Sequence, residues 1–174
     1  AFTRVEDLVA ESGVDAIDVV TSGSHRDSAV TAAEAGKHVM VENPFAVTVQ
    51  EADDMIAAAE KAGVNLMYAQ TWRFLPYGAR TRQLIEAGEI GDPISITASY
   101  ISERVRRGLL WHRQLALGGG FFMYEGTHFF DQVKWLMGSE IETVYAVGMG
   151  TYLLEGDGED NGLAGYRFEN GTFG

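Results

Sequence analysis

The chain has 174 residues with 13 basic and 25 acidic side chains, and its formal net charge of −12 argues against nucleic acids and anionic membranes as partners, because both bind a positive face. An apolar fraction of 46% is enough to bury a core, which excludes extended disorder, and no apolar run is long enough to span a membrane. The absence of cysteine excludes a disulfide framework and a thiolate metal site, and it fits a reducing compartment. Together these features lead us to expect a globular cytoplasmic protein.

The first part of the chain alternates between helical and strand patterns. Short β-branched apolar runs are typical of strands that are buried on both faces of a sheet. Strand, helix, strand, helix and strand with short connections predict a parallel α/β unit. Thr48 and Glu51 form a capping-box pattern, in which Glu51 is expected to reach back to the Thr48 amide. In chain order we predict a helix at 5–10, a strand at 15–21, a helix at 27–35, a strand at 37–41, a helix at 48–62 and a strand at 64–69.

The second part groups helices beside strands that alternate between apolar and polar residues. Such a grouping predicts an α+β domain, which we divide from the first domain between residues 71 and 72. The sequence Asn170-Gly171 is a hairpin-turn signal. We predict a helix at 77–87, a strand with one solvated face at 93–102, an apolar helix at 122–137 after the glycine run 118–120, and strands at 142–149 and 163–168.

Both ends of the sequence interrupt a predicted sheet, so we expect a chain that is truncated at its N- and C-termini. A dinucleotide-binding G-x-G-x-x-G string does not occur. The nearest matches, Gly148-x-Gly150 and Gly156-x-Gly158, lack the third glycine and lie in the antiparallel half.

Two loops follow predicted parallel strands directly and are the first candidates for a ligand site. Residues 42–44 read Glu-Asn-Pro, and residues 21–25 read Thr-Ser-Gly-Ser-His. The carboxyl ends of parallel strands are where open α/β sheets bind ligands. The structural alternatives are that 42–44 is only a turn, and that Ser24 or Asp27 only caps the helix after His25.

Tyr124, His128 and Asp131 lie at i, i+4 and i+7 on an otherwise apolar predicted helix. A phenol and an imidazole near one pocket could supply a proton and a hydrogen bond to a substrate oxygen. The alternative is a core histidine whose hydrogen-bond acceptor is Asp131. We expect no metal, because no second histidine or carboxylate lies at i+4 from His128.

Arg104, Arg106 and Arg107 form a basic cluster in this acidic chain. They could clamp an anionic substrate or a neighbouring subunit, or they could be the solvated end of a strand, which is the commoner role of such a cluster.

In chain order, these pieces resemble the Gfo/Idh/MocA family of NAD(P)-dependent oxidoreductases. Residues 35–44, AGKHVMVENP, look like the family's A-G-K-H-V-x-x-E-K-P. The resemblance continues in Arg73-Phe74-x-Pro76, in Gly88-x-Ile90-Gly91, and in Gly118-Gly119-Gly120 followed by Gly126-x-His128-x-x-Asp131. Because these strings occur in register along the chain, the resemblance is specific.

The resemblance implies the C-terminal half of a Rossmann parallel sheet at 1–71 and part of an α+β substrate and oligomerisation domain, with an open antiparallel sheet, at 72–174. It implies NAD or NADP as cofactor, a sugar- or polyol-like substrate, a cis Asn43–Pro44 bond, and a homo-oligomer formed through the C-terminal sheet. The residues that it places at the cofactor are Thr21, Ser22, His25, Glu42, Asn43, Pro44, Trp72 and Arg73. The residues that it assigns to catalysis are His128, Tyr124 and Asn43.

The chain departs from the family pattern at two of these catalytic positions. The lysine of E-K-P, which assists proton transfer in the family, is Asn43, and the aspartate four residues before the histidine is Tyr124. An asparagine amide can orient or polarise an oxygen but does not exchange a proton near neutral pH. A tyrosine can act as an acid.

Three functions stay open on this sequence. The first is an active oxidoreductase that moves a hydride between a nicotinamide and a sugar-like alcohol or ketone. The second is a cofactor-binding protein without hydride turnover. The third is a lyase, isomerase or glycosidase that uses its cofactor for a transient oxidation. The loss of the lysine favours the last two, whereas the retained His128 favours the first.

Overall fold

The computed structural model describes residues 2–11, 13–101, 111, 114–150 and 156–174. The chain forms two compact units, of which the first is Ala1–Ala69 with Leu115–Gly118 and the second is Gln70–Gln114 with Gly119–Gly174. The sequence predicts one division, at 71/72, whereas these two units divide after Ala69 and the first one also contains Leu115–Gly118. Gly118 packs so closely against the Pro44 ring that a Cβ on it would lie 2.9 Å from Pro44 Cγ. Among the described helices, none is long and apolar enough to cross a membrane.

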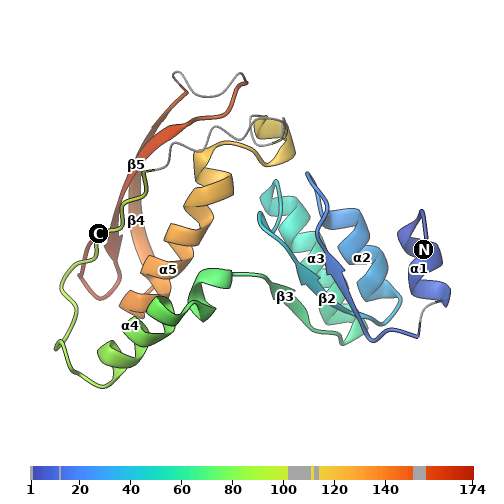
Figure 1. The fold of residues 1–174 in the computed structure, drawn as a ribbon, viewed down its shortest axis with the longest axis horizontal. Coiled ribbons are helices and arrows are strands. Elements are labelled where there is room, and N and C mark those ends of the chain that lie inside the picture. The colour runs from blue at the N-terminus through green and yellow to red at the C-terminus, as the bar shows by residue number, and fades with distance from the viewer. Residues whose placement is uncertain (1, 12, 102–110, 112–113, 151–155) are drawn as a thin grey trace. The chain divides into compact units, whose positions relative to one another are not determined.

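The first unit is a three-stranded parallel sheet with helices between its strands (Figure 1). The strand order is β1-β2-β3, which confirms the predicted parallel α/β arrangement. The elements are α1 (Val5–Glu11), β1 (Ala16–Val19), α2 (Arg26–Glu34), β2 (His38–Val41), α3 (Val49–Ala62) and β3 (Leu66–Tyr68).

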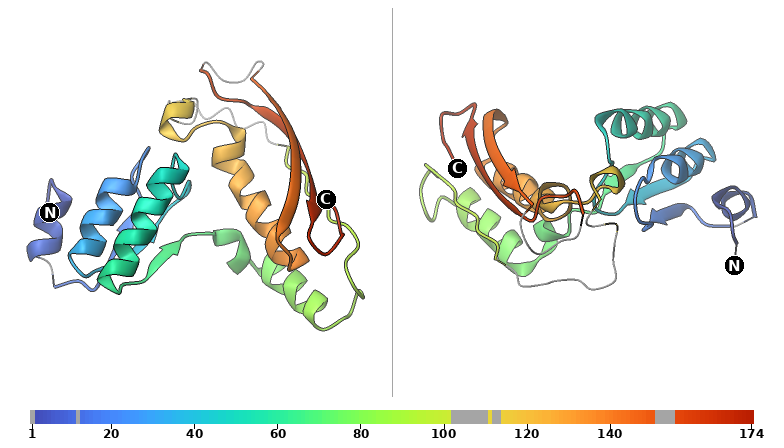
Figure 2. Two further views of the ribbon diagram at one scale, coloured as in Figure 1. Left: turned by 180° about the vertical axis from the view of Figure 1, so that it is seen from behind. Right: turned by 90° about the horizontal axis from the view of Figure 1, so that it is seen from above.

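The core of this unit lies on one face of the sheet, where α2 and α3 pack (Figure 2). Ile17 and Val19 of β1 and Val39 and Val41 of β2 point into it, whereas Asp18 between them is exposed. The prediction that the strands are buried on both faces is therefore wrong for the described residues. The physical reason is that both crossover helices pack on the same side of the sheet.

The termini of α3 follow the local sequence signals. Thr48 Oγ1 accepts a hydrogen bond from the Glu51 amide at 3.2 Å, and Gly63 ends the helix in the left-handed region. The capping box differs in one contact, because the Glu51 carboxylate accepts from the Val47 amide at 3.0 Å rather than from that of Thr48.

The second unit packs helices against an antiparallel hairpin. Phe168 is fully buried and contacts Val133 and Met137, so α5 lies along one face of the two strands (Figure 2). The elements of this unit are η1 (Thr71–Phe74), α4 (Pro76–Glu86), η4 (Phe122–Gly126), α5 (Thr127–Met137), β4 (Ile141–Met149) and β5 (Asn161–Phe168), while the 3-10 turn η3 (Leu115–Leu117) belongs to the first unit.

Two predicted elements of this unit differ in the structure. The helix predicted over 122–137 begins with a π-helical segment, Phe122–Gly126, before the α-helix. The strand predicted over 93–102 makes only an isolated bridge, from Ser95 to Phe173, within its described residues. A strand needs a run of such pairs, and alternation of apolar residues does not supply the partner. The turn at Asn170-Gly171 is confirmed, since Gly171 has a φ of +84° and the Phe168 amide donates to Thr172 O.

Candidate functional site

His25 joins the ends of the first two strands of the parallel sheet. Its side chain is 1% exposed, and its Nδ1 lies 2.9 Å from Pro44 O and its Nε2 2.6 Å from Thr21 O. His25 itself is the N-cap residue of α2 and caps it without a side-chain hydrogen bond, while the Arg26 amide donates to Ser24 Oγ at 3.3 Å. His25 is therefore a buried connection between the two loops that sequence analysis singled out.

Asn43 is held by a residue that sequence analysis did not single out. The Tyr68 hydroxyl donates to Asn43 Oδ1 at 2.7 Å, and the Tyr68 ring lies 5.4 Å from that of Phe45. The Asn43–Pro44 peptide bond is cis, as the resemblance implies. The Tyr68 hydroxyl therefore holds the Asn43 side chain through its amide oxygen.

Other predicted cofactor residues lie at the same edge of the sheet. Thr21 and Ser22 are exposed just after β1, and Glu42 is half-buried just after β2, with its carboxylate accepting from the Asn43 amide at 3.2 Å. The carboxyl edge of the sheet thus presents hydroxyl, carboxylate and amide groups within the first unit.

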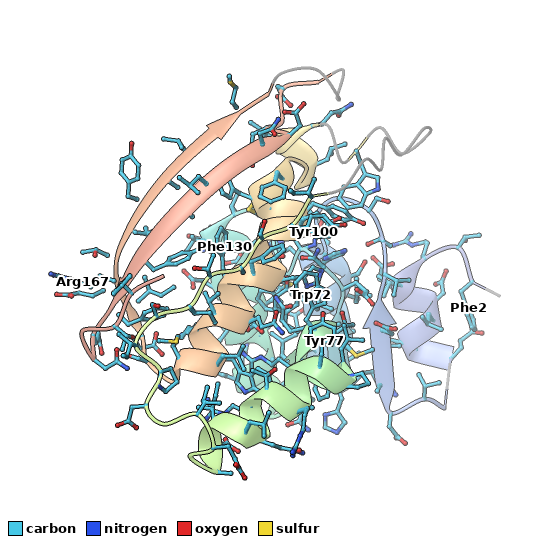
Figure 3. All side chains as sticks on the ribbon, turned by 60° about the vertical axis from the view of Figure 1, so that its left-hand side comes forward. Phe2, Trp72, Tyr77, Tyr100, Phe130 and Arg167 are labelled. Atoms are coloured by element: carbon cyan, nitrogen blue, oxygen red, sulfur yellow. The ribbon has the colours of Figure 1, made fainter. Side chains whose placement is uncertain are left out.

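The second cluster lies in the second unit, around His128 near the start of α5. His128 Nδ1 lies 3.0 Å from Gln70 Oε1, and the Gln70 amide nitrogen donates to Thr127 O at 3.3 Å. The Trp72 ring stacks on the imidazole at a centroid distance of 5.0 Å and an angle of 9°, and its side chain lies beside α5 (Figure 3). Gln70 therefore takes the place at His128 Nδ1 that the structural alternative gave to Asp131.

Asp131 instead pairs with Arg73. The guanidinium donates to both carboxylate oxygens, at 2.7 and 2.5 Å, and also lies 5.8 Å from the Trp135 ring centroid. The hydrogen bonds to Asp131 raise the pKa of Arg73 above its ordinary value, so the arginine stays charged. This bidentate pair ties η1 to α5.

Tyr124 has its own aromatic partner. Its ring meets the Trp111 ring edge to face, with centroids 5.3 Å apart. Tyr124 belongs to the π-helical segment and His128 to the α-helix, so the i, i+4, i+7 spacing does not describe one regular helical face. Tyr124, His128 and Asp131 each make a different side-chain contact.

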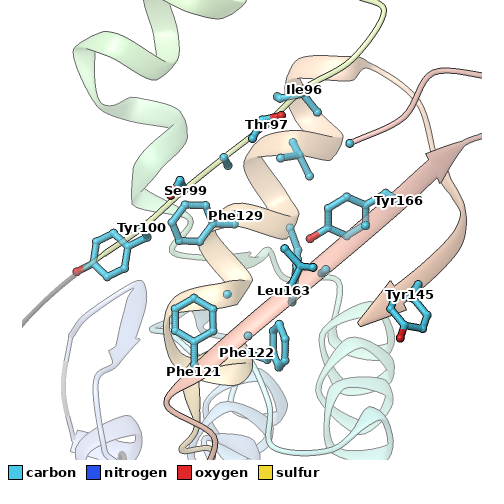
Figure 4. A pocket seen from close by; sticks show the side chains of 18 residues that line it. Ile96, Thr97, Ser99, Tyr100, Phe121, Phe122, Phe129, Tyr145, Leu163 and Tyr166 are labelled. Carbon is cyan, nitrogen blue, oxygen red and sulfur yellow. The ribbon is translucent and has the colours of Figure 1, made fainter. Parts of the chain in front are cut away.

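A cavity of about 450 Å³ also lies in the second unit, between α5 and β5 (Figure 4). Aromatic rings surround it, among them those of Tyr100, Phe122, Phe129 and Tyr166. Neither His128 nor any other predicted catalytic residue lines it, so this cavity is not the site that the sequence predicts.

Two further predictions concern ions and charge. Within the described ranges, no group of three or more His, Asp or Glu side chains could hold a metal ion. The basic cluster of Arg104, Arg106 and Arg107 lies outside the described residues.

Sequence analysis missed Tyr68 and Gln70. Both lie at the carboxyl end of the third predicted strand, and that position is itself a signal, since the same argument selected the loops after the first two strands. Gln70 is 6% exposed, and a buried amide needs partners that only a distant segment supplies.

Family models match both parts of the chain. Residues 1–70 match the model described as "Oxidoreductase family, NAD-binding Rossmann fold", and residues 79–174 match the one described as "GFO/IDH/MocA C-terminal domain".

Curated relatives and solved structures agree with these matches. The chain is 32% identical over 99% of its length to 1,5-anhydro-D-fructose reductase of Ensifer adhaerens, and 30% identical over 97% to scyllo-inositol 2-dehydrogenase (NAD(+)) of Bacillus subtilis (strain 168). It covers 52% and 49% of these relatives, so it spans about half their length. The structure of levoglucosan dehydrogenase in complex with NADH and levoglucosan matches with a TM-score of 0.89, 28% identity, and coverage of 99% of this chain and 50% of that one. That of the WlbA dehydrogenase from Bordetella pertussis in complex with NADH and UDP-GlcNAcA gives 0.83, 28%, 99% and 55%.

Proposed function

Because the chain belongs to the GFO/IDH/MocA oxidoreductase family, we propose that the whole protein is an NAD(P)-dependent oxidoreductase acting on a sugar- or polyol-like alcohol or ketone. The observation that carries this proposal is the His128 imidazole, which is held by Gln70 and stacked on Trp72 near the start of α5. A scaffold has no need for a titratable ring held in this way. The relatives named for sugar and inositol chemistry support the substrate class.

The residues at the carboxyl edge of the parallel sheet fit the nicotinamide part of such a cofactor. Thr21 and Ser22 offer exposed hydroxyls, and His25 connects their loop to Pro44. The two hydroxyls would donate to and accept from the ribose hydroxyls and the carboxamide of a dinucleotide. The bound cofactor supplies the acceptor or donor of the hydride. Trp72 and Arg73 remain proposed cofactor residues from the second unit.

We assign the transfer of the substrate hydroxyl proton to His128 and Tyr124. The imidazole takes or returns a proton, and the phenol donates a hydrogen bond to the substrate oxygen. To Asn43, in the first unit, we assign the polarisation of an oxygen without exchange of a proton. The Tyr68 hydroxyl holds the Asn43 amide in place for that role.

A second candidate function follows from Asn43 itself. A neutral amide where the family has lysine favours a protein that binds the cofactor without net redox turnover, or one that oxidises its substrate only transiently during a lyase, isomerase or glycosidase reaction.

The experiment that decides between these functions uses the full-length protein with NAD⁺ or NADP⁺ and a panel of sugars and polyols. Reduction of the nicotinamide is followed by absorbance. His128→Ala is expected to lower turnover by about 10²–10⁴-fold, the usual range for loss of a positioned acid or base. Tyr124→Phe is expected to be similarly damaging, whereas Tyr77→Phe, on the exposed surface of α4, is the matched control.

Asn43→Lys separates the redox and non-redox candidates. A gain of dehydrogenase activity supports the view that Asn43 marks a diverted enzyme, whereas a loss supports a site built around a neutral amide. Cofactor binding with no net change of the nicotinamide in any variant, whether or not a product forms, replaces the redox proposal with the second candidate.

We also propose that the hairpin face opposite α5 joins copies of the protein. Its register and alternation place four apolar residues on one face, Tyr145, Val147, Met149 and Leu163, which are 70, 49, 58 and 68% exposed. Val147→Asp in the full-length protein is expected to lower the mass measured by light scattering, and an unchanged mass removes this proposal.

A further inference from the structure

The hydrogen bond between Gln70 and His128 has a defined direction. Gln70 Oε1 lies 3.0 Å from His128 Nδ1, and the other end of the same amide donates to Thr127 O at 3.3 Å. Turning the amide over would bring its oxygen against the Thr127 carbonyl oxygen, and two acceptors cannot bond. The carbonyl end of Gln70 therefore faces the imidazole, and the nitrogen facing it must carry a hydrogen.

We propose that Gln70 is a positioning residue that selects the Nδ1–H tautomer of neutral His128. A neutral imidazole carries one hydrogen, so the lone pair then lies on Nε2. The role of this nitrogen in proton transfer rests on the function proposed above, whereas the tautomer does not.

Burial makes this hydrogen bond an effective constraint. Gln70 is 6% exposed, so water does not readily replace it as the acceptor for His128 Nδ1. Loss of the bond leaves the buried Gln70 carbonyl oxygen unsatisfied. The Trp72 ring, parallel to the imidazole within 9°, restricts its tilt, and the bond to Gln70 restricts its rotation within the plane. Together these contacts hold both the direction and the protonated nitrogen of the ring.

The nearest carboxylate on the same helix does not compete for this role. Asp131 lies three residues after His128, but both of its oxygens accept from Arg73. The Gln70 amide is neutral. It therefore differs from a carboxylate partner, whose negative charge would favour the imidazolium over the neutral imidazole.

The direct test is the nitrogen resonances of His128 in the full-length protein. Two-bond ¹H–¹⁵N correlation spectra of ¹⁵N-histidine-labelled protein, recorded where the ring is neutral, show which nitrogen is bonded to hydrogen. His128→Gln assigns the signals. We expect the hydrogen on Nδ1 in the natural protein. In Gln70→Met, which keeps the side-chain length but removes the acceptor, we expect a mixture of the two neutral tautomers or the Nε2–H tautomer.

Two variants control this result. Gln70→Glu keeps an acceptor oxygen and is expected to retain the Nδ1–H form, and Gln83→Met makes the same chemical change on the exposed surface of α4 and is expected to leave the spectrum unchanged. Where turnover is measurable, Gln70→Met is expected to lower kcat by about 10–100-fold with a smaller effect on KM, the range known for residues that orient a metal-ligating histidine.

The outcomes separate this inference from the proposed function. Two results overturn the role of Gln70 even if the enzyme is active. One is a natural protein that carries the hydrogen on Nε2. The other is a Gln70→Met spectrum that is identical to the spectrum of the natural protein. An Nδ1–H ring in a protein whose turnover is untouched by His128→Ala supports the role of Gln70 and removes His128 from the mechanism.

Discussion

The contact between Gly120 and Glu159 gives the sharpest prediction about how the start of the helical segment carrying Tyr124 and His128 is stabilised. Gly120 has a φ of +93°, and a Cβ built on it would lie 2.6 Å from Glu159 Oε2. The same carboxylate accepts from the Phe122 amide at 2.8 Å, in the first turn of that segment. A methyl group at position 120 would therefore strain the backbone and displace the carboxylate.

Gly120→Ala is expected to cost two separable amounts of free energy. The left-handed backbone costs roughly 1–2 kcal/mol for a residue with a Cβ. Loss of the charged contact at the helix N-terminus costs about 1–2 kcal/mol more. We therefore expect Gly120→Ala to lower the free energy of unfolding of the second unit by about 2–4 kcal/mol.

Gly171→Ala is the matched control. Gly171 has a φ of +84° in the same unit, and a Cβ built on it would meet nothing within 4 Å. It is expected to show the backbone cost alone, roughly 1–2 kcal/mol.

The assay is urea unfolding of the full-length protein followed by tryptophan fluorescence. The tryptophans of this sequence, Trp72, Trp111 and Trp135, all belong to the second unit, so the part of the fluorescence signal that they contribute reports on that unit. In a Glu159→Ala background the carboxylate is absent, and Gly120→Ala should then cost no more than Gly171→Ala. Strictly additive effects of Gly120→Ala and Glu159→Ala, or equal costs for the two glycine variants, would refute the reasoning.

Three further predictions concern single side chains. Burial raises the pKa of Tyr166 above its ordinary value of 10.0. Its contribution to stability is therefore present below pH 10 and is lost as the pH rises through the folded pKa. In urea unfolding between pH 9 and 11, Tyr166→Phe should lose less stability than the natural protein. Asp131→Asn breaks a bidentate ion pair whose arginine is 41% exposed, so we expect a loss of only about 1 kcal/mol, and an effect above about 3 kcal/mol in the same assay would contradict this discount for solvent screening. Tyr68→Phe removes the hydrogen bond to Asn43 and is expected to lower the free energy of unfolding by about 1 kcal/mol, with Tyr77→Phe as the exposed control; equal effects of the two variants would count against the contact.

Local signals in the sequence were enough to predict most of the backbone. The hydrogen bond from the Glu51 amide to Thr48, the left-handed Gly63 that ends α3, and the turn at Gly171 all depend on residues within a few positions of one another. The parallel order of the strands followed from the alternation of elements, because short connections leave few topologies.

Only the tertiary structure decided which faces are buried and which strands pair. The runs around Ile17 and Val39 are apolar enough for either one or two buried faces, and the position of the crossover helices determines which occurs. The segment after Pro93 alternates like a strand, yet only Ser95 finds a bridge partner among its described residues. Hydrophobic periodicity predicts which face of its own segment a side chain lies on, but it does not predict which other segment packs against that face.

The candidate site shows the same division between sequence and structure. The sequence by itself determined that Asn43, His128 and Tyr124 are the residue types capable of chemistry and that they follow strands or lie on a helix. The structure decided their partners, since Gln70 reaches His128 across 58 positions of the chain and Tyr68 reaches Asn43 across 25. A hydrogen-bond partner is chosen by distance and direction in space, and neither quantity is encoded in spacing along the chain once the two residues belong to different elements.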